Sequence, residues 1–430
     1  MPLPSTWAGS SLISSKHGRI SDSNDIFVSH LESAIDGTRF PAGVVYDTHA
    51  GRPIVVRYDL PRLKRSVERQ QITRRPADMW RYRDLLPVQE GDEITLGEVM
   101  TPLVRCERTA RRYGLKDLWI KDESTLPTGS FKSRGQAVAI SMAKSLGIRR
   151  LAIPTAGNAG GAMAAYAARA GLEAYIFMPV DTPRVNQLEA VLAGAHVYLV
   201  DGLIDDCGKI VAAGKEAVGW FDLSTLKEPY RLEGKKTMGF ELAEQFEWDL
   251  PDVIIYPTGG GTGLIGMWKA FQELTELGWL NADDLPRMVS VQSEGCCPVV
   301  RAFEKGERFC TRFENAETMA RGLRVPAAVG DFMILDAIYA SKGCAIAVQE
   351  HQIPHWMQTT ISDEGLSICP ESATCIGAIE SLIESGWLKS SDRTVIFNCA
   401  SARKYSDLID LKLPRIRDPK TIDWDQIAIA

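Results

Sequence analysis

From about residue 97 onward, short runs rich in β-branched residues alternate with runs that have helical spacing. The short runs are apolar at consecutive positions rather than at alternate ones, as in Val253–Pro257. Strands of that kind are buried on both faces, which is typical of parallel sheets covered by helices. The chain is therefore predicted to be α/β, with two parallel-sheet, three-layer α/β domains that face a cleft.

The same pattern gives limits for the elements and the domains. The predicted strands are Leu118–Lys121, Leu151–Pro154, Ala174–Met178, His196–Val200, Val253–Pro257, Met288–Gln292, Ala345–Val348 and Val395–Asn398. The predicted helices are Gly135–Leu146, Ala159–Ala170, Asn186–Leu192, Lys235–Phe246 and Leu264–Glu273. We expect an N-terminal arm over residues 1–80 with one short strand at Ile54–Tyr58, a small domain over 131–239, and a large domain made of 81–130 and 240–430.

Charge and hydropathy exclude two classes of partner. The chain has 49 Lys and Arg against 55 Asp and Glu, which gives a net charge of −6. An acidic chain lacks the overall field that draws proteins to a phosphate backbone, so nucleic acid is not an expected partner. No apolar run is long enough for a membrane span, and cytoplasm is the predicted location.

The cysteines and histidines predict neither disulfides nor a metal site. The nine cysteines include no Cys-x-x-Cys pair, and an odd number favours reduced thiols. His351 and His355 are four residues apart, but Glu350 precedes both instead of following the first, so the helical zinc pattern is not met.

A lysine stands at a predicted helix start in the segment Lys121–Gly135. Ser130 is a plausible N-cap, which places Lys132 in the first helical turn. The positive end of the helix dipole disfavours an ammonium there and lowers its pKa, as Schiff-base chemistry requires. The alternative is a solvated lysine on an exposed helix start.

Two small-residue segments each follow a predicted strand and open a helix. Residues 154–162 read Pro-Thr-Ala-Gly-Asn-Ala-Gly-Gly-Ala, and such a turn can bind a carboxylate through backbone N–H groups. Residues 258–264 read Thr-Gly-Gly-Gly-Thr-Gly-Leu, which favours a small monophosphate because neither a P-loop lysine nor a dinucleotide fingerprint is present. The alternatives are a tight strand–helix turn and a flexible glycine loop.

Together these three segments are the groups that would hold pyridoxal 5′-phosphate against an amino acid. The chain resembles the fold-type II pyridoxal phosphate enzymes of the tryptophan synthase β-subunit group, in Pro127–Lys132, Gly157–Gly160 and Gly259–Gly263. Within that group it looks most like threonine synthase, because Arg231–Thr237 is similar to that family's Arg-(Ile/Leu)-Glu-Gly-Gln-Lys-Thr stretch. The order of motifs agrees over about residues 80–410.

The resemblance implies a role for each matching residue and places the cofactor in the cleft, on the large domain. Lys132 is the expected catalytic residue and Schiff-base lysine. The other expected cofactor-binding residues are Phe131 at the ring, Asn158 at the 3′-oxygen, Gly259, Gly260, Gly261, Thr262 and Gly263 at the phosphate, and Cys399 at the pyridine nitrogen. The expected substrate-binding residues are Thr155, Ala156, Gly157 and Ala159 at the carboxylate, Arg231 at a substrate phosphate, and Glu371 in a turn that lines the site.

Two departures from the family pattern bear on the substrate. Relatives usually read Asn-Thr-Gly-Ser-Gly-Leu-Lys-Tyr where this chain has Asn398–Tyr405, so Cys399 replaces a threonine, and Ala400 and Ala402 replace glycines. A thiol is a weak hydrogen-bonding group, and the alanines are expected to stiffen the turn or block positive φ. Residues 47–53 lack the paired cysteines of a zinc ribbon, so no metal is expected.

The resemblance implies a lyase that converts O-phosphohomoserine and water into threonine and phosphate. A different β- or γ-elimination or replacement, such as that of a serine or threonine dehydratase or of a specialised biosynthetic paralogue, is an alternative. A non-catalytic paralogue is a further one. Relatives are commonly dimers, so a homodimer with a small amino-acid substrate is expected.

Overall fold

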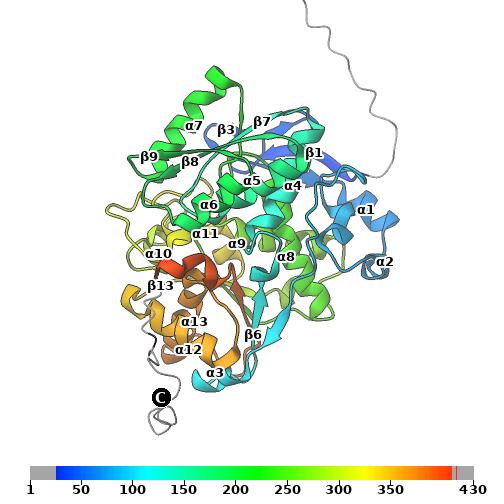
Figure 1. Ribbon diagram of the computed structural model, residues 1–430. Coiled ribbons are helices and arrows are strands. Elements are labelled where there is room, and N and C mark those ends of the chain that lie inside the picture. The colour runs from blue at the N-terminus through cyan, green and yellow to red at the C-terminus, as the bar shows by residue number, and fades with distance from the viewer. Residues whose placement is uncertain (1–25, 409–412, 414–430) are drawn as a thin grey trace, which may run out of the picture.

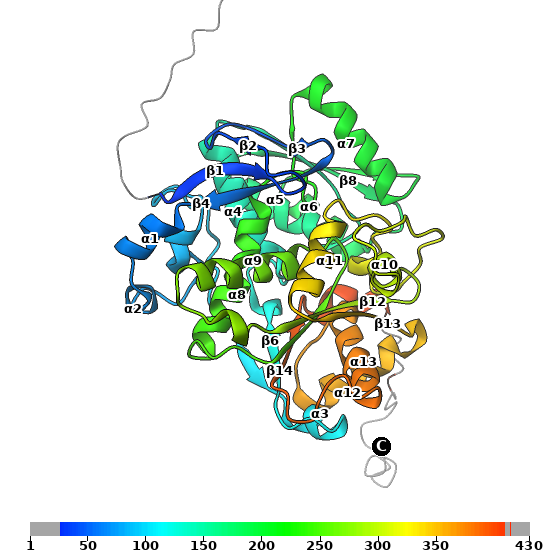
Figure 2. The same ribbon diagram turned by 180° about the vertical axis from the view of Figure 1, so that it is seen from behind.

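The computed structural model describes residues 26–408 and 413, which form three β-sheets with helices packed on them (Figures 1 and 2). Residues 1–25, 409–412 and 414–430 lie outside the described residues, including the first part of the predicted N-terminal arm. The helices are α1 (Leu60–Ser66), α2 (Arg69–Thr73), α3 (Glu107–Arg112), α4 (Lys132–Ser145), α5 (Asn158–Ala170), α6 (Arg184–Leu192), α7 (Ile204–Val218), α8 (Arg231–Gln245), α9 (Thr262–Glu276), α10 (Pro298–Glu304), α11 (Asp331–Ala340), α12 (Ile353–Glu364) and α13 (Pro370–Glu384).

The larger sheet has the strand order β13-β12-β11-β14-β6-β5. Its strands are β5 (Leu103–Arg105), β6 (Leu118–Asp122), β11 (Val253–Pro257), β12 (Arg287–Ser293), β13 (Cys344–Val348) and β14 (Thr394–Asn398). All neighbours are parallel except β5 and β6. Along β11, Ile255 packs in the cluster of α12 and α13 whereas Ile254 packs in the cluster of α8 and α9, so the sheet is the middle of three layers.

The smaller sheet is wholly parallel, with the order β10-β7-β8-β9. Its strands are β7 (Arg150–Pro154), β8 (Glu173–Pro179), β9 (His196–Val200) and β10 (Phe221–Asp222). Helix α7 covers one face, where Val211 packs with Phe177 and Trp220, and helices α5 and α6 cover the other (Figure 1). Both sheets therefore confirm the predicted α/β class.

A third, antiparallel sheet precedes the two parallel ones, with the order β2-β1-β4-β3. It consists of β1 (Val28–Ser33), β2 (Arg39–Phe40), β3 (Thr48–His49) and β4 (Arg52–Tyr58). The predicted strand at Ile54–Tyr58 lies within β4, whereas the other three strands were not predicted. Tyr58 at the end of β4 donates a hydrogen bond to Glu233 of α8 over 2.7 Å, so this sheet is fixed to the body of the protein.

The eight strands predicted after residue 97 all lie at the predicted places, and so do the five predicted helices, all of which begin earlier than expected. Helices α3, α7 and α10 to α13 and strands β5 and β10 were not predicted. The domain limits remain a proposal; strands β7 to β10 lie within the proposed small domain, 131–239. In the part of the chain that the structure describes, no helix has both the length and the apolar character that a membrane span requires.

Candidate active site

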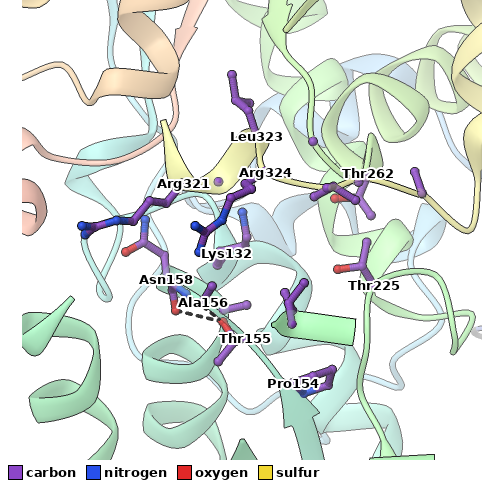
Figure 3. A pocket seen from close by; sticks show the side chains of 18 of the residues that line it. Lys132, Pro154, Thr155, Ala156, Asn158, Thr225, Thr262, Arg321, Leu323 and Arg324 are labelled. Atoms are coloured by element: carbon purple, nitrogen blue, oxygen red, sulfur yellow. Dashed lines mark hydrogen bonds between the residues drawn. The ribbon is translucent and has the colours of Figure 1, made fainter. Parts of the chain in front are cut away.

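Residues at the ends of strands from the larger and the smaller sheet line one cavity of about 520 Å³. It is lined by the residues that follow β7, β11 and β14, the carboxyl ends at which parallel sheets bind ligands (Figure 3). The sequence-predicted site residues all line it, namely Phe131, Lys132, Thr155, Ala156, Gly157, Asn158, Ala159, Arg231, Gly259, Gly260, Gly261, Thr262, Gly263, Glu371 and Cys399. The structure thus brings together segments that are more than 200 residues apart in sequence.

Lys132 is the first residue of α4, as predicted, and its side chain reaches the cavity. Its Nζ lies 3.7 Å from the centroid of the Phe131 ring. The pKa of Lys132 is lowered to about 8, chiefly by burial; Cys399 opposes this fall, and the charge of Arg231 contributes to it. The predicted fall in pKa is thus present, but burial and not the helix dipole is its main cause.

The predicted N-cap role of Ser130 is wrong. Phe131 occupies the N-cap position of α4 and makes no side-chain capping bond. Ser130 is buried, and its hydroxyl has no hydrogen-bond partner among the described residues. Its backbone instead forms a bridge to Ala400, which ties the lysine loop to the end of β14.

In the glycine loop, residues 259–263, the four glycines cannot carry side chains without displacing their neighbours. A Cβ at Gly259 would collide with the carbonyl oxygen of Gly322, and one at Gly263 would collide with the hydroxyl of Tyr256. Gly261 adopts φ +77° at the N-cap of α9, a conformation that favours glycine. The loop therefore presents bare backbone and the free N–H groups of a helix start to the cavity, which fits a phosphate group.

Some polar groups of the loop before α5 already form hydrogen bonds within the loop. The N–H of Gly157 donates to the hydroxyl of Thr155 over 3.1 Å, and that hydroxyl donates to the carbonyl of Gly157 over 3.0 Å. Asn158 accepts a bond from Asn186 over 3.0 Å and donates one to the hydroxyl of Tyr405 over 3.1 Å. The Asn158 amide is thus held in place from both ends, while its second N–H remains for a ligand.

One buried polar atom on the cavity lining, Arg231 Nε, has no hydrogen-bond partner within the described residues. Arg231 is 2% exposed, and its Nη1 donates to the carbonyl of Leu223 over 2.6 Å. Buried polar groups are rarely left unpaired, so an unpaired guanidinium nitrogen on the lining of a cavity indicates a polar ligand. Bare amides, an unpaired guanidinium nitrogen and a low-pKa amine fit a phosphorylated aldehyde together with an anionic amino acid.

Cys399 joins the end of β14 to the lysine loop. Its carbonyl accepts a hydrogen bond from the N–H of Phe131 over 2.9 Å, and its own N–H donates to Ser372 over 2.8 Å. Burial raises the pKa of its thiol to about 12, so the thiol stays protonated. Ala400 and Ala402 are not among the described residues with positive φ, so the expected conflict between these alanines and the turn does not arise.

Several lining residues were not predicted, among them Tyr256, Arg321, Arg324 and Tyr405. Tyr256 lies directly before Pro257 and the glycine loop, and Tyr405 closes the motif that contains Cys399, so proximity to a motif was a usable signal for both. Arg321 and Arg324 come from a long connection between α10 and α11 that has no periodic pattern. No sequence signal placed these arginines at the site.

Comparisons with known proteins agree with this chemistry. The family model "Pyridoxal-phosphate dependent enzyme" matches residues 94–400. Threonine synthase of Methanocaldococcus jannaschii is 33% identical over 85% of this chain and 90% of its own length, and that of Methanosarcina acetivorans is 35% identical over 79% and 82%. Maize serine racemase has a similar structure, with a TM-score of 0.62 at 21% identity over 72% of this chain and 92% of its own.

A second solved structure shares the fold at still lower identity. Diaminopropionate ammonia lyase from Escherichia coli has a TM-score of 0.62 at 18% identity over 73% of this chain and 87% of its own. At these identities the two solved structures show the fold alone. The family match and the relatives above 30% identity extend over most of the chain and carry the assignment to a family.

Proposed function

The chain belongs to the pyridoxal-phosphate dependent enzymes as a lyase whose cofactor is pyridoxal 5′-phosphate, and we propose that it acts as a threonine synthase. The proposed reaction converts O-phosphohomoserine and water into threonine and phosphate. Relatives bearing the name threonine synthase support this choice. A homodimer in the cytoplasm remains a prediction from the resemblance.

When bound, pyridoxal phosphate supplies an electrophilic carbon for amines and a conjugated ring that takes up electron density. The proposal assigns its phosphate to the amides of Gly259–Gly263 and its aldehyde carbon to Lys132. Asn158 would donate to the ring oxygen with its free N–H, and Cys399 would face the ring nitrogen. Phe131, whose ring already lies against Lys132, would keep water from that amine.

Lys132 is suited to move protons near neutral pH because burial lowers the pKa of its amine to about 8. Once free, this amine would remove the proton at the α-carbon of the substrate and return protons later in the reaction. Loss of a proton from the β-carbon with departure of the γ-phosphate, protonation of the γ-carbon and addition of water at the β-carbon would then complete the reaction. The loop at Thr155–Ala159 would bind the α-carboxylate through the N–H groups that its internal bonds leave free.

The observation that carries the proposal is the guanidinium of Arg231. It is buried and lines the cavity, no described carboxylate forms an ion pair with it, and its Nε has no partner among the described residues. A guanidinium binds phosphate through two parallel hydrogen bonds, so the phosphate of the substrate is the partner that this group lacks. A substrate without a second anionic group would leave Arg231 unpaired.

The direct test is phosphate release from O-phosphohomoserine by the holoenzyme. Lys132→Ala is expected to remove the yellow absorbance band of the bound cofactor and to lower turnover by about 10²–10⁴-fold or more. Lys227→Ala is the matched control, since Lys227 also lines the cavity but lies 3.8 Å from Asp222 and outside the three motifs. If the unaltered protein releases no phosphate, the threonine synthase proposal fails.

A second candidate is β-elimination on serine or threonine, which releases a keto acid and ammonia. It is favoured by Cys399, which departs from the threonine synthase pattern, and by the hydrogen bond that already occupies one nitrogen of Arg231. Keto-acid release from serine or threonine without phosphate release from O-phosphohomoserine would select this reaction. The assay pair therefore separates the two candidates with one preparation.

A further inference from the structure

Two arginines extend from a short segment on the cavity lining, η4 (Arg321–Leu323) and the following Arg324 (Figure 3). The backbone of this segment is fixed: the N–H of Gly322 donates to Glu371 over 2.8 Å, and the carbonyl of Gly322 packs against Gly259. The segment is therefore attached to the glycine loop itself. The backbone of the segment therefore has a set position relative to the cofactor-binding part of the cavity.

The two arginines have acidic partners in different parts of the fold. Arg321 pairs with Asp407 over 2.7 Å, and both belong to the side of the large sheet. Arg324 pairs with Asp181 over 3.0 Å, and Asp181 follows β8 of the small sheet. The Arg324–Asp181 pair thus joins the two sides of the cavity, and Figure 3 shows Arg324 reaching toward Lys132 while Arg321 extends away from it.

We propose that Arg324 is a specificity-determining residue that binds the distal anionic group of the substrate by exchanging Asp181 for it. This inference rests on the proposed function, in which the substrate carries a phosphate. Arg231 lines the same cavity from the start of α8. Arg324 would add a second guanidinium from the segment that follows η4. Asp181 holds Arg324 in place until the substrate arrives.

The exchange is physically favourable because the partners differ in solvation and geometry. The Asp181 side chain is 54% exposed, whereas that of Arg324 is 20% exposed. An ion pair with an exposed carboxylate stabilises little, since water competes for both groups. Only one nitrogen of Arg324 donates to Asp181, whereas a phosphate accepts two parallel bonds and carries more charge.

The test measures binding to the holoenzyme with two probes that differ only in the anionic group. These are the phosphonate isostere of O-phosphohomoserine, which has no leaving group, and L-norvaline, which lacks the phosphonate. Titration of the cofactor absorbance gives a dissociation constant for each. Arg324→Gln is expected to weaken phosphonate binding by about 10- to 100-fold and norvaline binding by less than about threefold. Asp181→Asn is expected to strengthen phosphonate binding or leave it unchanged.

The variants separate this role from two simpler ones. If Arg324 and Asp181 only hold the two sides together, both substitutions weaken phosphonate binding, and the proposal is overturned. Arg321→Gln is the matched control, because Arg321 lies on the same segment at similar exposure with an acidic partner of its own. An equal loss in that variant would show a general effect of positive charge and would also overturn the proposal.

Failure of the proposed function gives a different pattern. If the unaltered holoenzyme binds the phosphonate no better than norvaline, the proposal of a phosphorylated substrate is contradicted, and so is the proposed role of Arg324. If the unaltered protein prefers the phosphonate and Arg324→Gln keeps that preference, only the role of Arg324 is wrong.

Discussion

Lys235 and Lys236 are consecutive residues of helix α8, and both side chains are fully buried, yet their surroundings differ. Lys236 lies 2.7 Å from Glu233 and 2.7 Å from Glu273, beneath the ring of Tyr58. Lys235 donates to the carbonyl of Phe131 and lies over the Phe131 ring, and no described carboxylate forms an ion pair with it. One helix therefore buries a compensated charge on one side and an uncompensated amine on the other.

The difference extends to the regions that the two lysines face. Toward the N-terminal sheet, Lys269 completes a cluster of two cations and two carboxylates. Toward the cavity, the side chains of Lys132, Arg231 and Lys235 form no carboxylate ion pair among the described residues, and burial lowers the pKa of each. The protein balances its buried charges where they hold the fold together. At the cavity it leaves room for an anionic ligand to supply the balance.

Removing Lys236 is the strongest test of this comparison. Lys236→Met would leave Glu233 and Glu273 to share Lys269 alone, and breaking a buried ion pair in this way typically costs about 3–5 kcal/mol. We expect a loss of that size in the free energy of unfolding, measured by urea denaturation. The catalytic groups are untouched, so activity of the folded fraction should persist.

Lys235→Met is the matched variant on the other side of the helix. Burial lowers the pKa of Lys235 well below its usual value, so folding disfavours the charge that this amine carries in the unfolded chain. Its replacement should leave stability unchanged or increase it. Equal losses in the two variants would contradict the distinction between the compensated and uncompensated sides.

The next effect concerns pH and the unfolding of the cofactor-free protein. The pKa of Lys132 is about 8 when folded and 10.5 ordinarily, so between these values the unfolded state binds more protons. The free energy of unfolding therefore rises with pH across that window. Below pH 8 the folded protein carries the full cost of burying the charged amine. Lys132→Met lacks the penalty, and because the side chain is partly exposed we expect it to be about 1–2 kcal/mol more stable at pH 7. The gain should shrink toward pH 10; a constant gain would show that packing, not titration, causes it.

The site was predictable because its residues lie at strand–helix junctions. Parallel strands end at one edge of a sheet, so Gly259 and Cys399, which follow β11 and β14 of the larger sheet, had to meet once the alternation was recognised. Thr155 follows β7 of the smaller sheet, and only the predicted cleft between the two domains placed it opposite them. The N-terminal sheet was not predictable in the same way, because β2 and β3 have two residues each and show no period. The pKa of Lys132 was expected in direction but not in cause, since burial arises from distant segments that pack around the helix start.

The sequence likewise could not predict which of the two buried lysines of α8 pairs with carboxylates. Lys235 and Lys236 are adjacent residues with the same helix propensity, and only the packing of Phe131 on one and of Tyr58 on the other distinguishes them. Arg324 lies in a connection without periodicity, and its partner Asp181 is 143 residues away. Tertiary contacts of this kind decide which charges are paired and therefore which remain for a ligand.

The smallest expected effect concerns Cys399, the neutral group on the uncompensated side. Burial raises the pKa of its thiol to about 12, so a weak and uncharged hydrogen-bonding group faces the cavity. Cys399→Thr supplies a hydroxyl, and a net hydrogen bond of about 0.5–1.5 kcal/mol corresponds to a two- to tenfold rise in turnover of O-phosphohomoserine. Cys375→Thr, a buried cysteine away from the cavity lining, is the control for volume and polarity. A fall in turnover for Cys399→Thr alone, with a shifted absorbance band of the cofactor, would mean that the thiol is suited to another substrate. The substrate preference of the cavity would then depend on this neutral group as well as on the unpaired charges.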